Sequence, residues 1–205
     1  MNFGRLVLRA AVGGFFFGHG TQKLRGWFGG PGLEATAQGF EKMGMRPGRV
    51  NAIAASVAET AGGAAIALGL ATPLAASALT ATMLTAINRV HLKNGPWVGK
   101  GGYEYNVVLI ASVLALAETG PGRPSLDHAL GIERSGAEWA ALALVLGAGG
   151  AAGAHLLASL APADQPEAPA ASADGSEQAS TESQEPAGGR GPGQGDEGVR
   201  ASSVR

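Results

Sequence analysis

The chain has 205 residues, a formal net charge of −1 at pH 7 and no cysteine. The absence of cysteine excludes disulfides, thiolate metal sites, iron–sulfur clusters and a thiol nucleophile, so any redox role must use chemistry without thiols. The sequence contains no basic face with interleaved aromatic residues, no GxxxxGK[ST] motif and no strand-linked GxGxxG motif. We therefore expect no nucleic-acid or nucleotide partner.

The composition changes sharply near residue 160. Residues 161–205 contain eight acidic and three basic residues, and their only large aliphatic side chains are Val199 and Val204. Such a segment cannot bury enough apolar area to offset the entropy lost on ordering, so we predict a disordered acidic tail over 161–205. The preceding residues are strongly apolar and rich in Ala and Gly, with no alternation of period two, which disfavours strands.

Several stretches are long and apolar enough for helices that cross a hydrocarbon core of about 30 Å. A soluble all-α protein is the alternative, but residues 61–71 and 73–84 carry no charge, whereas soluble helices carry a polar stripe. We read the first stretch as a retained span, because residues 19–25 are polar and basic where a signal peptide would have a cleavage site. We predict spans at 4–24, 51–71, 73–91 and 105–119, and a fifth candidate at 137–160.

These spans predict an all-α fold, namely a transmembrane four-helix bundle over residues 1–130. A linker and the candidate fifth span follow over 131–160. Residues 26–32 (GWFGGPG) cannot continue a helix, residues 33–45 can form a short amphipathic helix in the interface, and residues 93–106 form a second ordered loop. The loops after the first and third spans carry most basic residues, which predicts that they and the tail lie in the cytoplasm.

Ionisable groups inside a bilayer cost several kcal/mol unless they are paired or hydrated, so each needs an explanation. A rise of about 1.5 Å per helical residue places Glu59 near mid-depth, about one turn from the level of His19. The same arithmetic brings polar side chains from four spans to one boundary. We predict that they converge there as a cluster of His19, Gln22, Lys23, Glu59, Asn88, Arg89 and Glu104.

Glu59 must be protonated, paired with Lys23 or His19, or open to a wet cavity. It could exchange protons with a quinone or a transported solute, or it could simply fix the packing of two helices; the sequence leaves both readings open. At the opposite boundary Arg9 and Glu118 lie at similar depth, and we predict a structural ion pair between them.

Other polar and aromatic residues have plainer interpretations. Four residues are candidate metal ligands: His19, Glu59, His91 and Glu104. There is no HExxH motif and no pair of histidines one turn apart, so we predict no metal site. His128 and His155 have no polar neighbours in the sequence and receive no role. Aromatic residues at the loop boundary are read as interface anchors, with an aromatic-lined mouth for a quinone headgroup as the alternative: Trp27, Phe28, Trp97, Tyr103 and Tyr105.

Four segments together resemble the DoxX family of small bacterial membrane proteins. They are HGTQKLRGWFGGPGLEATAQGFEKMG (19–44), AETAGGAAIALGLATPLAA (58–76), the KNG-W segment with GGYEYN (101–106), and TGPGRPSLD (119–127). The resemblance covers about residues 4–130. It implies a multi-pass four-helix bundle in the bacterial cytoplasmic (plasma) membrane, often an accessory subunit beside redox enzymes. The recurrent polar positions of the family fall on His19, Lys23, Glu59, Glu104 and Tyr105, which adds Tyr105 to the predicted cluster.

We expect an integral membrane subunit of a redox-associated complex, in contact with lipid and with protein partners. The resemblance links such complexes with quinone-dependent sulfur oxidation and with oxidative stress. In this hypothesis the polar cluster holds a quinone headgroup or relays protons, while a partner supplies electrons. The chain would then have no intrinsic cofactor and would not be an autonomous enzyme. A small-solute transporter and a membrane scaffold without chemistry are the alternatives, and the sequence leaves the oligomeric state open.

Overall fold

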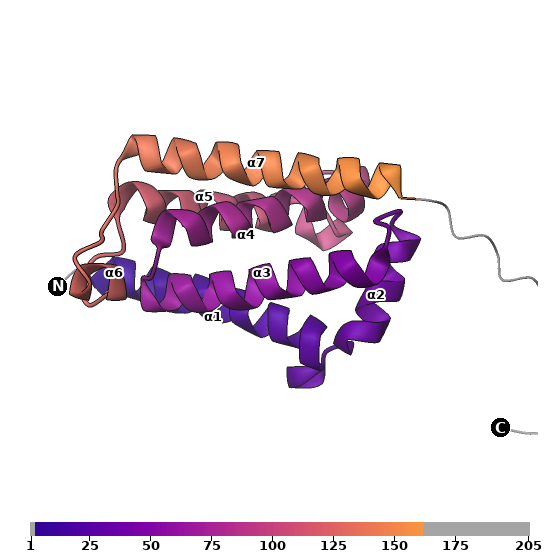
Figure 1. Cartoon of the computed structure of the whole chain (residues 1–205), viewed down its shortest axis with the longest axis horizontal. Coiled ribbons are helices and arrows are strands. Elements are labelled where there is room, and N and C mark those ends of the chain that lie inside the picture. Colours follow the sequence, from indigo (N-terminus) through magenta and orange to yellow (C-terminus); the bar gives the residue numbers. More distant parts are fainter. Residues whose placement is uncertain (1–2, 162–205) are drawn as a thin grey trace, which may run out of the picture. The chain divides into compact units, whose positions relative to one another are not determined.

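The computed structural model describes residues 3–161. Within that range five long helices lie alongside one another, and no strand occurs (Figure 1). The predicted all-α fold is therefore confirmed. The predicted tail, from residue 162 onward, lies outside the described residues. The long helices are α1 (Phe3–Arg25), α3 (Gly48–Leu68), α4 (Thr72–Ala86), α5 (Glu104–Thr119) and α7 (Ala137–Leu160).

Short elements gather at the two ends of the helices (Figure 1). One end, the loop end, consists of residues 26–47 and 87–103. It contains α2 (Gly32–Lys42), a π turn at Ile87–His91 that continues α4, and 3-10 turns at Trp27–Gly29, Leu92–Asn94 and Val98–Lys100. The other end, the turn end, consists of residues 69–71 and 120–136. It contains the tight connection between α3 and α4 and the four-residue α6 (Leu126–Ala129).

The predicted segments correspond to the observed helices, with shifts at the termini that glycine and proline explain. The second predicted span corresponds to α3. This helix begins at Gly48, directly after Pro47, and ends at Leu68 because Gly69 adopts a left-handed conformation with φ of 64°. The third predicted span is α4 followed by the π turn, since Ile87–His91 forms wider helical hydrogen bonds. The interfacial helix predicted at 33–45 is α2, and α6 was not predicted.

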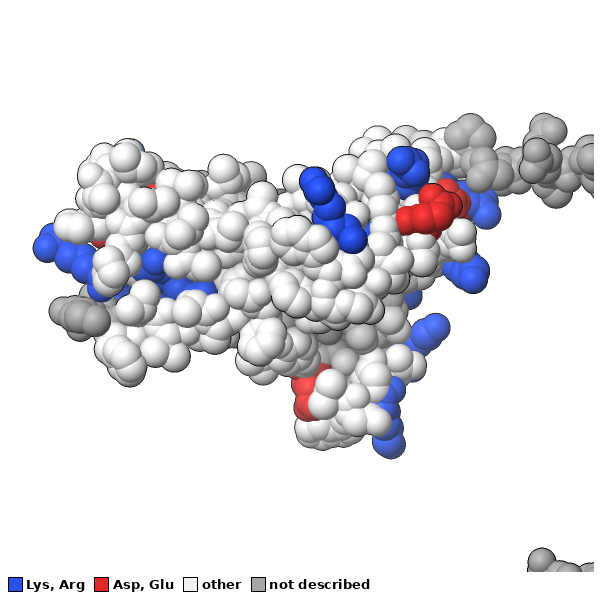
Figure 2. Space-filling model, turned by 90° about the horizontal axis from the view of Figure 1, so that it is seen from below, with Lys and Arg blue, Asp and Glu red and all other residues white. Residues whose placement is uncertain are grey.

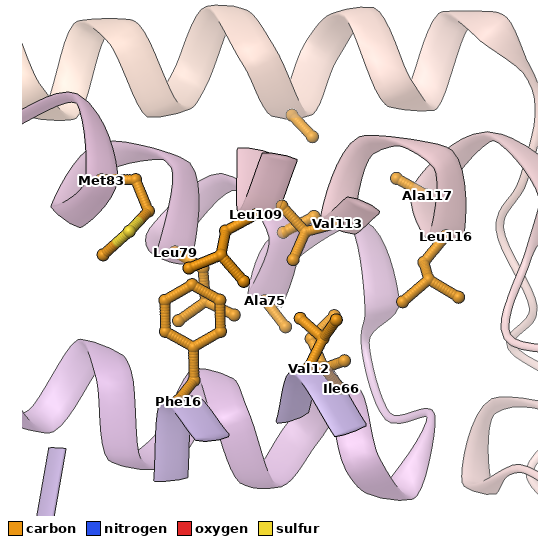
Figure 3. Packing of buried hydrophobic residues seen from close by; sticks show 12 residues of the cluster. Val12, Phe16, Ile66, Ala75, Leu79, Met83, Leu109, Val113, Leu116 and Ala117 are labelled. Atoms are coloured by element: carbon orange, nitrogen blue, oxygen red, sulfur yellow. The ribbon is translucent and has the colours of Figure 1, made fainter. Parts of the chain in front are cut away.

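The core lies where α1, α3, α4 and α5 meet, and α7 covers it with Ala143 (Figure 3). Helix α4 is central, because it contacts α3, α5 and α7. The candidate fifth span, α7, packs against α4 and α5. The labelled core side chains in Figure 3 are Val12, Phe16, Ile66, Ala75, Leu79, Met83, Leu109, Val113, Leu116 and Ala117.

Glycines let α1 and α3 approach closely. A Cβ atom added to Gly63 would lie 2.7 Å from the carbonyl oxygen of Gly13, and one added to Gly20 would lie 2.8 Å from that of Ser56. Neither distance is tolerated by real atoms, so glycine is required at these crossings. Small residues at such contacts are typical of helix pairs in lipid, where close backbone approach supplies the packing energy.

The outer surface between the two ends is apolar. Phe15, Val108 and Leu157 are each more than half exposed, and on the face in Figure 2 the charged side chains lie toward the ends. Large exposed apolar areas are rare on soluble monomers, so this surface suits lipid contact. Within residues 3–161, α3 and α7 are the two helices long and apolar enough to cross a membrane.

Candidate functional site

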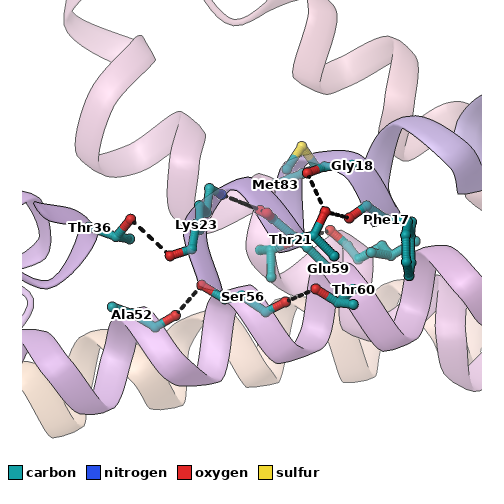
Figure 4. Close-up of polar contacts among 12 residues, drawn as sticks. Phe17, Gly18, Thr21, Lys23, Thr36, Ala52, Ser56, Glu59, Thr60 and Met83 are labelled. Atoms are coloured by element: carbon teal, nitrogen blue, oxygen red, sulfur yellow. Dashed lines mark hydrogen bonds and ion pairs between the residues drawn. The ribbon is translucent and has the colours of Figure 1, made fainter. Parts of the chain in front are cut away.

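An ion pair joins α1 and α3 near the loop end. The Nζ atom of Lys23 lies 2.7 Å from Oε1 and 2.6 Å from Oε2 of Glu59, so both carboxylate oxygens accept from it (Figure 4). The Glu59 side chain is 3% exposed, whereas that of Lys23 is 31% exposed. The close crossing at Gly20 brings Lys23, one turn later on α1, within reach of α3. Lys23 thus connects a buried carboxylate with the surroundings of the loop end.

The ion pair lies in the wall of a cavity of about 560 Å³. Its volume falls within the range of about 300–1,000 Å³ that is usual for small-molecule sites. The walls come from α2, α3, α4 and α7, and most of the lining residues are apolar. The alanines and glycines among them are Gly39, Ala54, Ala55, Ala58, Ala78, Ala81, Ala86, Gly150 and Ala154.

Arg89 borders the same cavity from the π turn. Its Nε donates a hydrogen bond to Nδ1 of His155 on α7 at 2.8 Å, and its Nη1 lies 3.5 Å from the carbonyl oxygen of Met43. A ring nitrogen can accept a hydrogen bond only when it carries no hydrogen itself. This contact therefore requires the His155 tautomer in which Nδ1 is unprotonated. π turns inserted in α-helices are frequent at functional sites.

The structure brings together only part of the predicted cluster. Lys23 and Glu59 meet, and Arg89 borders the same cavity. The side chains of His19, Asn88 and Tyr105 are exposed. Depth along a helix sets the level of a side chain but not the face from which it projects, and these three project outward.

The two remaining members of the cluster lie outside the cavity. Gln22 is partly buried against Gly30, where an added Cβ would lie 2.5 Å from the Gln22 Cβ. Glu104 accepts a hydrogen bond from the backbone N–H of Val98 at 2.8 Å and so fixes the loop that precedes α5.

The predicted ion pair between Arg9 and Glu118 is wrong. Arg9 is 3% exposed and donates to four carbonyl oxygens at the turn end, whereas the Glu118 side chain is exposed. The acceptors are those of Ile66 at 3.1 Å, Ala67 at 2.8 Å, Pro121 at 2.8 Å and Pro124 at 2.7 Å. The carbonyls at the end of α3 lack partners within the helix, and a cation is favoured there, so they compete successfully for the guanidinium.

Asp127 binds the backbone at the start of α4, as Arg9 does at the end of α3. It is 1% exposed and accepts from the backbone N–H groups of Ala71 at 2.6 Å and Thr72 at 3.1 Å, and from the Thr72 hydroxyl at 2.9 Å. An anion is favoured at a helix N-terminus. Its contact also holds Ala71, a residue with a left-handed φ of 44°. The segment containing Asp127 carried the family resemblance, but nothing in the sequence indicated its burial.

His128 and His155, to which the sequence assigned no role, both have polar partners in the structure. His128 Nδ1 lies 3.1 Å from Oε2 of Glu133, and His155 accepts from Arg89. The aromatic-lined mouth is not observed: the cavity lining includes Phe40 but none of the aromatic residues proposed for it. Among residues 3–161 no group of three or more His, Cys, Asp or Glu side chains is placed to hold a metal ion.

The comparisons with known proteins agree with one another. The DoxX family model matches residues 4–92. A Bacillus subtilis (strain 168) protein named "Putative oxidoreductase CatD" is 34% identical over 113 residues, which make up 55% of this chain and 78% of that protein. The chain belongs to the DoxX family. It is a membrane protein, in contact with the lipid bilayer. No solved structure matches it.

The matched region of this DoxX protein contains only part of the cavity. Lys23, Glu59 and Arg89 fall within residues 4–92. Helix α7, which supplies Gly150 and Ala154 to the wall and His155 to Arg89, lies beyond it. The fourth wall of the cavity is therefore built by a segment outside the DoxX match.

Proposed function

We propose that this DoxX protein is a multi-pass subunit of a redox-associated complex in the cytoplasmic membrane, and that its cavity binds a quinone headgroup. One observation carries the proposal: a buried carboxylate and its lysine partner line an apolar cavity among helices. A relative named as an oxidoreductase supports the redox association.

The chemistry of the cavity suits a quinone. A quinone ring is flat and apolar, and walls of alanine and glycine leave room for such a ring between helices. Its carbonyl oxygens need hydrogen-bond donors. The Lys23 ammonium group has three N–H bonds, of which Glu59 accepts two, so one remains for a ring oxygen. A charge-assisted hydrogen bond in an apolar cavity is stronger than the same bond in water.

The ion pair also suits proton transfer. Reduction of a quinone to its quinol takes up two electrons and two protons. In this proposal a partner oxidoreductase supplies both electrons, and the protons reach the ring oxygens one at a time through Lys23 and Glu59. Because Lys23 is partly exposed and Glu59 is not, the lysine amine can take up a proton again from water near the loop end. The DoxX chain thus binds and protonates without carrying electrons itself.

A transporter would need access to the cavity from both ends. At the turn end, Arg9 and Asp127 are buried and bound to the backbone of α3, α4 and the residues after α5. Opening that end would break several hydrogen bonds at once, each of which is costly to leave unmade in an apolar environment. The geometry favours a site entered from one side.

The test measures quinone binding to the purified full chain in lipid nanodiscs. The probe is a short-chain ubiquinone, followed by quenching of tryptophan fluorescence. We expect saturable binding to the wild type and a dissociation constant at least about tenfold higher for Glu59→Gln and Lys23→Met, since a charge-assisted hydrogen bond is lost. Glu118→Gln, a change of the same kind at an exposed carboxylate, is the matched control and should bind as the wild type does.

Two results would overturn the proposal. The first is a wild-type protein that binds no quinone. The second is equal binding by the wild type and the Glu59→Gln variant, with both melting at the same temperature. Under the scaffold hypothesis, by contrast, co-purification of partner proteins from mild detergent would persist in both cavity variants while no quinone bound.

A further inference from the structure

We propose that Arg89 anchors an ionised oxygen of the ligand, so that the cavity selects quinones whose ring carries an anionic group. The inference rests on the proposed function, because it assumes that the cavity binds a quinone. It goes beyond that function by naming the charge of the ligand, the residue that recognises it, and the part played by α7.

The charges of the cavity do not balance. Lys23 is neutralised by Glu59, which binds it through both oxygens. Arg89 has only neutral acceptors, the His155 ring and the Met43 carbonyl. Among residues 3–161 no carboxylate lies within ion-pairing distance of Arg89. The lining therefore carries one uncompensated positive charge in mostly apolar surroundings.

An uncompensated guanidinium beside an apolar cavity attracts an anion strongly, because the low dielectric weakens screening. The guanidinium has five N–H bonds, of which Nε–H is used by His155 and one Nη1–H points toward Met43. The others remain for a ligand. A planar fork of donors matches an oxyanion with an adjacent carbonyl oxygen, the arrangement found in an ionised hydroxyquinone.

His155 acts as a positioning residue for Arg89. Its Nδ1 atom lies 2.8 Å from Arg89 Nε and so fixes the orientation of the guanidinium plane from α7. The neighbouring lining residues of α7, Gly150 and Ala154, are too small to fill the space in front of it. The helix outside the DoxX match thus both closes the cavity and orients its charged group.

The experiment compares two quinones of nearly equal shape on the full-length protein in nanodiscs of zwitterionic lipid. One is 2-hydroxy-1,4-naphthoquinone, which is ionised at neutral pH, and the other is its neutral 2-methoxy analogue. We expect the wild type to bind the anion at least about tenfold more tightly than the neutral ring. Arg89→Gln should abolish this preference and leave the affinity for the methoxy compound within about twofold.

Three further variants test whether the preference for the anion depends on the geometry of Arg89. Arg25→Gln removes an exposed basic residue at the loop end that does not line the cavity, and it should retain the full preference. Arg89→Lys keeps the charge but loses the fork, and His155→Phe loses the acceptor that orients it. Both should show a reduced preference with unchanged affinity for the neutral ring, which a purely structural role would not produce.

The outcomes separate this inference from the proposed function. If the wild type binds neither the naphthoquinones nor the short-chain ubiquinone, both fail. If it binds ubiquinone but neither naphthoquinone, the quinone site stands and the selection of anionic quinones is overturned. If it binds both compounds equally, or if Arg89→Gln retains the preference for the anion, the quinone site stands and the anchoring role of Arg89 is overturned. If His155→Phe keeps the wild-type preference, His155 does not position Arg89.

Discussion

The turn end and the loop end of this DoxX protein both bury charged side chains, but they satisfy them in different ways. At the turn end, Arg9 and Asp127 bind mainly backbone groups at the two helix termini that meet there. Nearer the loop end, Glu59 on α3 binds the side chain of Lys23, and the pair faces a cavity of about 560 Å³. The first arrangement joins helix termini to one another, and the second leaves space beside its charges.

The kind of partner distinguishes charged side chains that stabilise the fold from those available to a ligand. Backbone groups at helix termini are fixed, so a side chain that binds them stabilises one geometry. An ion pair between side chains, one of them partly exposed, can exchange a proton or accept a ligand without unfolding a helix. Burial alone does not distinguish the two cases, because Arg9 and Glu59 are each only 3% exposed.

The largest effect is expected from Arg9→Met. It leaves four carbonyl acceptors at the turn end without their donor, and removal of one partner from a buried charged network costs about 3–5 kcal/mol. Thermal unfolding in nanodiscs, followed by circular dichroism, should show a lower midpoint and a lower yield of folded protein. Quinone binding per folded molecule should be unchanged.

Arg123→Gln is the matched control at the same end. Arg123 is exposed, so its loss should change the free energy of unfolding by less than about 0.5 kcal/mol. If Arg9→Met were as mild as Arg123→Gln, the turn end would not be held by Arg9, and the contrast between the two ends would disappear.

A pair of identical changes on α4 gives the next largest effect. Ala76 near the turn end is fully buried, and Ala86 near the loop end lines the cavity. Ala76→Leu overfills a packed region and should destabilise the protein by about 1–3 kcal/mol. Ala86→Leu should change stability by less than about 0.5 kcal/mol, since space is present, yet weaken quinone binding by narrowing the cavity.

Denaturation midpoints and ubiquinone titrations on the same samples check both variants. An equally large loss of stability for Ala86→Leu would mean that the space beside the ion pair is packed in solution. Wild-type quinone affinity in Ala86→Leu would place the ligand elsewhere.

The helices could be predicted from the sequence because their signals are local. The apolar runs gave segments within about three residues of α1, α3, α5 and α7, although the predicted second span ran past Gly69, where α3 ends, and the third included the π turn after α4. The π turn at Ile87–His91 and the four-residue α6 were missed, since neither has a periodic apolar pattern long enough to detect.

The site was harder to predict because it depends on rotation about each helix and on distant contacts. Depth arithmetic found the level shared by Lys23 and Glu59, but it also included His19 and Asn88, which project outward. The contact of Arg89 with His155 joins residues 66 positions apart in the sequence. Periodicity within one helix carries no information on such a pair, and the open volume between helices appears only when all are packed together.

The smallest effect is expected from the ion pair itself, measured by a double-mutant cycle of Lys23→Met and Glu59→Gln. Because Lys23 is 31% exposed, water screens the attraction, and the coupling energy should be about 0.5–1 kcal/mol, as for surface pairs. That is well below the loss expected for Arg9→Met, although both changes affect a charge inside the helices. A coupling above about 3 kcal/mol, with quinone binding retained in the double variant, would instead make the pair a structural lock like that of the turn end. A small coupling together with lost quinone binding is the outcome that the cavity predicts, because charges kept for a ligand contribute little to the fold when the ligand is absent.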